Sequence, residues 1–122
     1  MTEYVVAIPG ELWTVNAERN RHHYWRAART RQWRSDAFYA ARLTGIPHLE
    51  RAEIEVAVEQ ARGKLADPGS HAPPAKAAID GLVDAGVLPD DSPAHLLRLS
   101  FVPPIKSPDG IGRLVLTIKE CP

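Results

Sequence analysis

The sequence predicts an α+β protein with one mixed β-sheet and helices packed against it. Short segments with β-branched or alternating composition are typical of strands, and two longer segments carry apolar residues at helical spacing. Their order is strand, helix, strand, helix, strand, strand, which indicates a single sheet covered by helices. With 122 residues, 44% of them hydrophobic, the chain has the length for one core, so we expect one domain over residues 1–122.

The first half of the chain contains two strands separated by a long helix. Tyr4 opens a β-branched run that a Pro-Gly pair ends. A stretch without glycine or proline then carries Trp33, Ala37 and Ala41 at four-residue spacing, which indicates the buried face of a helix. Glutamates alternating with branched apolar residues indicate a half-buried strand after it. The predicted elements are a strand over residues 4–8, a helix over 25–43 and a strand over 52–61.

The second half begins with a proline-rich loop and a second helix. Pro73 and Pro74 stand where proline is tolerated, at the start of a helix, and Gly86 suits the C-cap. In the next strand, alternation places Leu97 and every second residue after it on the buried face. The predicted elements are a helix over residues 73–85, a strand over 95–102, a turn over 108–110 and a strand over 112–120.

Charge is distributed unevenly along a chain whose formal net charge is zero. From residue 18 to residue 34 there are six arginines and one acid. Residues 80–91, the acidic segment, hold four aspartates and no basic residue. The first region therefore favours an anionic partner such as phosphate, and the second favours a cation.

Residues 19–31, the basic segment, combine arginines with aromatic residues. Tyr24 and Trp25 lie among the arginines and Trp33 follows, so charge for phosphates is joined to faces that stack on unpaired bases. Branched or single-stranded DNA is the expected partner. The alternative is a solvated helix face with buried tryptophan anchors, which Trp33 fits because it belongs to the apolar stripe. The residues expected to bind DNA are Arg19, Arg21, Tyr24, Arg26, Arg29 and Arg31.

A second candidate site combines acids with a lysine. We expect Asp67, at a strand end, to approach Asp90 and Asp91, in the turn after the next helix. Carboxylates bind Mg²⁺, and Lys76 at a helix N-terminus favours a phosphate beside the metal. These are the groups of a metal-dependent nuclease. Alternatively the aspartates form turns, Lys76 is a solvated helix residue, and His71 is either a further ligand or an exposed loop residue.

Several function classes lack their sequence signatures in this chain. There is no glycine-rich phosphate loop and no Ser-His-Asp arrangement, and the single cysteine, Cys121, excludes a disulfide framework and a cysteine-rich zinc site. No apolar run approaches the roughly 20 residues that cross a bilayer, and no signal-peptide pattern opens the chain. We therefore expect a cytoplasmic protein without membrane contact.

The stretch AKAAIDGLVDAGVLPDDS, residues 75–92, resembles the RusA family of Holliday junction resolvases, small endonucleases common in phages and prophages. In that family a lysine begins a helix, an Asp-x-Leu step lies within it, and a Gly-x-x-x-Asp-Asp turn ends it. Lys76, Asp80 with Leu82, and residues 86–91 match these features. The order of strands is similar over nearly the whole chain.

The resemblance implies a homodimer that binds four-way DNA junctions in recombination and repair, in a phage-infected or prophage-bearing bacterium. It implies an endodeoxyribonuclease that cuts two strands symmetrically with Mg²⁺ or Mn²⁺. Asp67 and Asp91 would be metal carboxylates, Asp90 would be a further one, and Lys76 would face the phosphate. The implied catalytic residues are therefore Asp67, Lys76 and Asp91.

The chain departs from the family at its Asp-x-Asp-Asn element. Residues 67–70 read Asp-Pro-Gly-Ser, so Gly69 replaces the second acid and Ser70 replaces the amide. An ungapped count back from Lys76 also loses acids, because it places Ser70 and Ala72 at their positions. Loss of one of three anionic ligands weakens Mg²⁺ binding.

Three expectations about function follow. The first is a structure-selective junction endonuclease. The second is a catalytically impaired relative that binds branched DNA or a protein partner without cutting. The third is a structural or regulatory phage protein with no DNA role, which is favoured if the basic segment is buried in a dimer interface.

Overall fold

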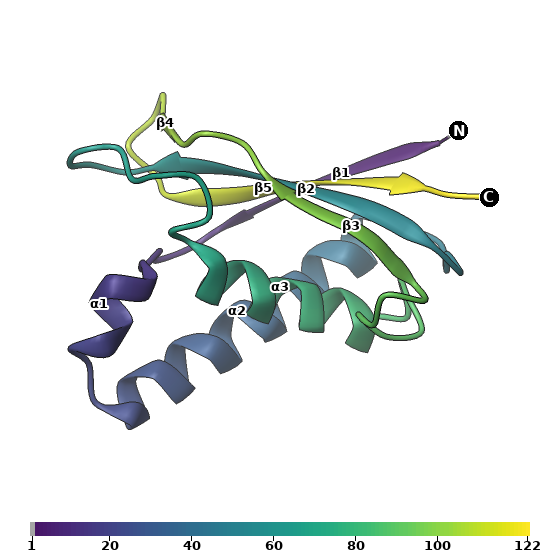
Figure 1. The fold of residues 1–122 in the computed structure, drawn as a ribbon, viewed down its shortest axis with the longest axis horizontal. Helices are drawn as coiled ribbons and strands as arrows, with labels where there is room; N and C mark the ends of the chain where they lie inside the picture. Colours follow the sequence, from purple (N-terminus) through teal and green to yellow (C-terminus); the bar gives the residue numbers. More distant parts are fainter. Residues whose placement is uncertain (1) are drawn as a thin grey trace.

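One layer of the protein is a five-stranded mixed sheet, and the other is formed by two helices (Figure 1). The computed structural model describes residues 2–122. The predicted α+β class with a single mixed sheet is confirmed. In chain order the elements are β1 (Glu3–Pro9), α1 (Val15–Arg19), α2 (His23–Thr44), β2 (Ala52–Gln60), α3 (Ala72–Asp84), β3 (Leu96–Phe101), β4 (Ile105–Lys106) and β5 (Arg113–Glu120).

The sheet has the strand order β1-β5-β2-β3, with the short β4 paired to the end of β2. β5 is antiparallel to both of its neighbours, β1 and β2. β2 and β3 are parallel and are joined through α3, as parallel neighbours require a crossover. This connection places the loop before α3 at the carboxyl end of β2 and the loop after α3 at the amino end of β3.

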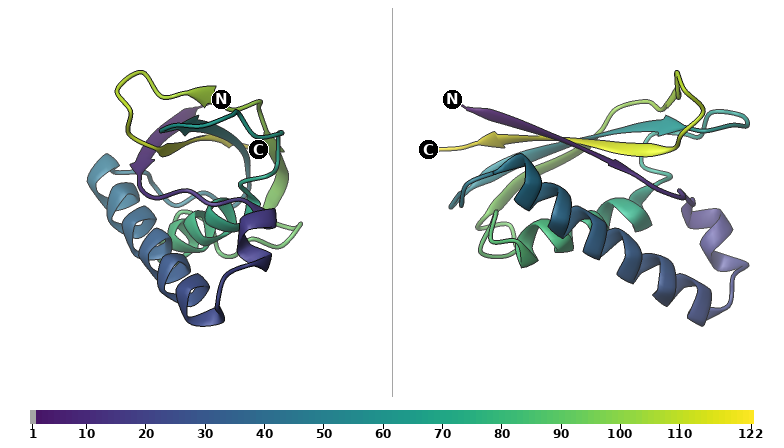
Figure 2. Two further views of the ribbon diagram at one scale, coloured as in Figure 1. Left: turned by 90° about the vertical axis from the view of Figure 1, so that its left-hand side faces the viewer. Right: turned by 180° about the vertical axis from the view of Figure 1, so that it is seen from behind.

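Helices α2 and α3 cover the same face of the sheet (Figure 2). The predicted stripe of α2 is confirmed, because Trp33, Ala37 and Ala41 are all buried. The two helices approach closely at Gly81 of α3, where an added Cβ would lie 2.2 Å from the carbonyl oxygen of Arg34. Glycine is therefore required there by the packing of the helices. Within residues 2–122 no helix has the length and apolarity needed to cross a membrane.

Two short elements were not predicted. α1 has five residues, none of them buried, so it leaves no apolar stripe in the sequence. It is held instead by Thr14, whose hydroxyl accepts the N–H of Ala17 at 3.2 Å. β4 has two residues and lies between prolines, too short to show an alternating pattern.

The predicted orientation of Leu97 is wrong. Its side chain is 47% exposed, because the pairing of β2 with β3 shifts register by one residue. Ala52 pairs with Leu96 and Glu53 pairs with Arg98, so Leu97 is passed over as in a β-bulge. The residues of β3 that pack against the core are Leu96, Leu99 and Phe101.

Candidate nucleic-acid interface and carboxylate site

Lys76 and Asp91 are brought together although 15 residues separate them. Lys76 is near the start of α3, and Asp91 lies in the turn that follows the helix and returns along it. The Lys76 ammonium donates a hydrogen bond to Asp91 Oδ2 and forms an ion pair with it. This bond raises the pKa of Lys76 above its ordinary value. The pair therefore places one carboxylate and one cation on the exposed side of α3.

Asp90 stabilises the turn itself. Its Oδ1 accepts the backbone N–H of Ser92 at 2.5 Å, and the side chain is exposed. The hydrogen bonds with Ser92 hold the pKa of the Asp90 carboxyl below its ordinary value. This is the turn-forming role that the sequence left open as an alternative to metal binding.

Asp67 lies in an irregular loop and not at a strand end as expected. β2 ends at Gln60, whose side chain organises the loop: its amide donates to Lys64 O at 3.0 Å and accepts from Ala66 N at 2.7 Å. The Asp67 side chain is exposed and, in the described part of the chain, has neither a hydrogen bond nor an ion pair. The structure thus shows no contact between Asp67 and the Lys76–Asp91 pair.

The side chains at this site do not form the group of three acidic metal ligands that the resemblance implies. Among residues 2–122 no three His, Cys, Asp or Glu side chains lie close enough to hold one metal ion. Asp91 is engaged by Lys76, and Asp90 by its own turn. Gly69, at the position of an expected acid, has φ +85°, a region that residues with a side chain rarely adopt. The loop conformation is therefore one that favours glycine over an acid.

The start of α3 offers little to an anion through its backbone. Pro73 and Pro74 carry no N–H, and the N–H groups of Ala72 and Ala75 bond to carbonyls of the preceding turn at 3.1 and 3.3 Å. A phosphate bound at this helix end would therefore depend on side chains such as Lys76.

The basic segment runs from the end of α1 into the first turns of α2. α1 and the first turns of α2 lie at one end of the molecule, away from the sheet (Figures 1 and 2). Tyr24 is 72% exposed, and its ring lies 4.1 Å from that of His23 between ring centroids. The arginines whose side chains are exposed are Arg19, Arg21, Arg26 and Arg31.

Most arginines of the basic segment are left without an acidic partner. Arg29 lies 3.0 Å from a carboxylate oxygen of Glu11, a contact without hydrogen-bond geometry. Across residues 2–122, the other four arginines of the segment form no ion pair. Arg21 instead lies over the ring of Trp25, 4.8 Å from its centroid. The positive charge of this segment is therefore available to a ligand.

The two tryptophans near the basic segment serve as anchors. Trp25 is half-buried and packs edge-on against Trp13, with ring centroids 5.7 Å apart. Trp33 is buried and its indole N–H donates to Glu11 O at 2.8 Å, which confirms the core role considered for it. Tyr24 is then the aromatic residue of this segment with most of its ring exposed.

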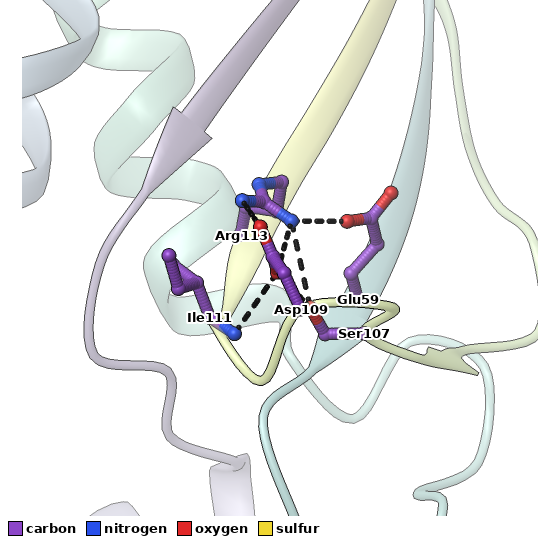
Figure 3. Close-up of polar contacts among 5 residues, drawn as sticks. All are labelled: Glu59, Ser107, Asp109, Ile111 and Arg113. Carbon is purple, nitrogen blue, oxygen red and sulfur yellow. Dashed lines mark hydrogen bonds and ion pairs between the residues drawn. The ribbon is translucent and has the colours of Figure 1, made fainter.

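Sequence reasoning missed a cluster around Arg113, at the start of β5 (Figure 3). The Arg113 guanidinium donates to Glu59 at 2.8 Å and to both carboxylate oxygens of Asp109 at 3.0 and 2.8 Å. These bonds hold the pKa of the Asp109 carboxyl well below its ordinary value. The cluster fixes the turn before β5. Glu59 and Arg113 face each other across β2 and β5. This pair could have been recognised in the sequence only if the register of the two strands were known.

His71, for which the sequence left a metal ligand or an exposed loop residue as alternatives, is buried. It lies just before α3 with only 4% of its surface exposed. A lone histidine in a polar loop gives no sequence signal for burial.

Fold and site together define an α+β protein with a projecting, positively charged, aromatic-bearing segment and a separate Lys–Asp pair. Comparison with protein-family models gives no match, and a search of curated proteins finds no similar protein.

Proposed function

We propose that this chain is a RusA-like protein that binds four-way DNA junctions, with the basic segment as its DNA-contacting surface. The observation that carries the proposal is the set of four exposed arginines without acidic partners in the described chain, grouped on projecting elements beside exposed Tyr24. Each arginine can neutralise a phosphate, and the tyrosine ring can stack on a base left unpaired at a branch point. These properties favour branched DNA over uninterrupted duplex.

The proposed protein acts as a homodimer in the cytoplasm of a phage-infected or prophage-bearing bacterium. The support for a dimer is that β1 lies at an edge of the sheet and carries Val5, whose side chain is 55% exposed. Two basic segments in one dimer would match the symmetry of a four-way junction.

The Lys76–Asp91 pair supports a second candidate, an Mg²⁺- or Mn²⁺-dependent endonuclease that resolves the junction. A cation beside a carboxylate is suited to a phosphodiester, as the resemblance implies. The carboxylates Asp67, Asp90 and Asp91 are not assembled into one donor set, so their arrangement does not define a hydrolytic step. The first candidate, binding without cutting, is the one that the arrangement of charges favours.

One assay separates the candidates. Purified protein is incubated with a labelled four-way junction and with linear duplex of the same sequence, in Mg²⁺, in Mn²⁺ and in EDTA. Preferential junction binding in EDTA without nicks in either metal is the expected result. Paired, metal-dependent nicks that disappear in Asp91→Asn would establish the endonuclease instead. Equal, weak binding to both DNAs would overturn both candidates.

A further inference from the structure

A pocket of about 330 Å³ opens where three loops meet at one end of the sheet. The loops follow β1, follow β2 and precede β5, and the pocket is lined by Gly10, Glu11, Arg62, His71, Gly110 and Gly112, among others. The basic segment begins close by, since the N–H of Val15 in α1 donates to Ser70 O at 2.9 Å. The volume is at the lower end of the range for small-molecule sites, which suits one planar heterocycle.

His71 is the unsatisfied polar group of this pocket. Its side chain is 4% exposed, and its buried Nδ1 has no hydrogen-bond partner in residues 2–122. Burial lowers the pKa of this imidazole, so the ring is neutral at neutral pH. A neutral imidazole offers one donor and one acceptor. An unpaired ring nitrogen in a buried position is unfavourable, and a ligand in the pocket reaches Nδ1 only if the ring turns about its Cβ–Cγ bond.

Among the described residues, the charges of the pocket lining leave Arg62 without an acidic partner. Glu11 and Arg62 bring opposite charges to the lining, and Glu11 is already paired with Arg29. The first turn of α3 holds two prolines and N–H groups already bonded to carbonyls, so the backbone there offers few donors and Arg62 is the charged donor that a ligand would meet. Of the three glycines in the wall, Gly110 has open space at its Cβ position, whereas the Gly10 N–H already donates to Gly112 O at 3.0 Å. An arginine and an imidazole supply donors that suit the acceptor atoms on the edge of a nucleobase.

We propose that this pocket receives one unpaired nucleobase of the DNA held by the basic segment, with His71 bonding the edge of the base. The inference rests on the proposed function, because the neighbouring basic segment is what would deliver the nucleotide. A base beside a branch point is easier to unstack than one within a duplex, so occupancy of the pocket would contribute to selection of branched DNA.

The test is a titration of the full ¹⁵N-labelled chain, followed by NMR. The probes are the four 2′-deoxynucleosides, which lack phosphate, and inorganic phosphate in a parallel titration. Saturable shifts of the Gly10, Gly110 and Gly112 amides with at least one nucleoside are expected, while those of Gly45 and Gly86, which lie outside the pocket lining, stay unmoved. No saturable shift with any nucleoside, or shifts with phosphate alone, would overturn the proposal.

A variant tests whether the His71 imidazole takes part in nucleoside binding. His71→Gln should weaken nucleoside binding by roughly threefold to tenfold, the effect of losing one hydrogen bond. Unchanged affinity would overturn the role of His71, and the wild-type titration remains decisive if this variant fails to fold. Junction binding is measured on the same sample. Junction binding without nucleoside shifts overturns the pocket alone, whereas nucleoside shifts without junction binding overturn the proposed function and make the free nucleoside the ligand.

Discussion

The basic and acidic segments carry opposite charges, and they differ in how those charges are satisfied. In the acidic segment, Asp84 receives two hydrogen bonds from Arg34, at 2.5 and 2.8 Å, and Asp91 receives one from Lys76. In the basic segment, Arg29 is paired, and the other four arginines form no ion pair with any residue in 2–122. A protein with zero net charge can therefore engage some of its acids in internal ion pairs and still leave a group of arginines for a partner. Zero net charge does not argue against nucleic-acid binding when charges are segregated in this way.

The largest effect should come from removing the unpaired arginines. A variant with alanine at all four positions is expected to lose junction affinity by about 10³-fold for each protomer bound, at about 1 kcal/mol for each lost phosphate contact. The slope of log K against log salt should become shallower by about four for each protomer bound. Fluorescence anisotropy at several salt concentrations measures both quantities. The substituted residues are Arg19, Arg21, Arg26 and Arg31.

A control of equal charge tests whether position matters. Four exposed basic residues outside the basic segment are replaced by alanine in a second variant, and its affinity should fall by less than roughly tenfold because only long-range steering is lost. Equal losses in the two variants would contradict the comparison of segments. The control residues are Arg42, Arg51, Arg98 and Lys106.

The next largest effect is expected at Gly81, where α2 and α3 pack closely in the helical layer. Gly81→Ala should cost at least about 3 kcal/mol of unfolding free energy, because the new Cβ meets the Arg34 carbonyl, which cannot move alone. Gly69→Ala is the matched change, at a residue with φ +85° and open surroundings, and should cost about 1–2 kcal/mol. Urea denaturation compares them. A smaller loss for Gly81→Ala than for Gly69→Ala would show that α2 and α3 do not pack this closely.

A smaller effect is expected from the Lys76–Asp91 pair. The two side chains are 55% and 32% exposed, so solvent screens the pair and its coupling energy should stay below about 1 kcal/mol. A double-mutant cycle with Lys76→Met and Asp91→Asn measures that coupling in unfolding experiments. A coupling well above this value would mean that the acidic segment depends on this pair for its structure.

The smallest effect is a pH dependence at the end of α3. The Gly86 carbonyl and the Glu50 carboxylate both accept from His48, at 2.7 and 3.0 Å, and raise the pKa of its imidazole above 6.5. Protonated His48 is therefore favoured in the folded state. Its contribution to the free energy of unfolding is fully present below the pKa of histidine in the unfolded chain, and it is lost as pH rises through the pKa of His48 in the folded state. The Tm should fall slightly across that window in the wild type, and this component should vanish in His48→Gln. If the pH-dependent component of Tm remained in His48→Gln, or disappeared in the exposed control His23→Gln, His48 would not be its source.

The long elements were predictable because their signals are local. The helix expected over residues 25–43 is α2, and Gly45 ends it with φ 75°, as a C-cap glycine does. α1 escaped prediction because it buries nothing, and Leu97 was misplaced because a bulge is a property of the strand pair. Local sequence patterns thus predict long helices and strands, but they do not predict a short exposed helix or a β-bulge.

The candidate sites depended more on tertiary structure. Exposure of the basic segment was expected from the shortage of acids around it. The reach of Asp91 back to Lys76, the distance of Asp67 from the end of β2, and the burial of His71 all depend on loop conformations that no spacing encodes. His71 in particular is buried by loops that are far apart in the sequence and meet only at the pocket.

Cross-linking from α2 tests the central claim most directly. Tyr24 and Tyr39 lie on the same helix and are 72% and 61% exposed, but only Tyr24 belongs to the basic segment. Each is replaced in turn by the photoreactive residue p-benzoylphenylalanine, and the protein is irradiated with a labelled four-way junction in EDTA. The account predicts strong cross-linking from position 24 and little from position 39. Equal yields from both positions, or a higher yield from position 39, would contradict it.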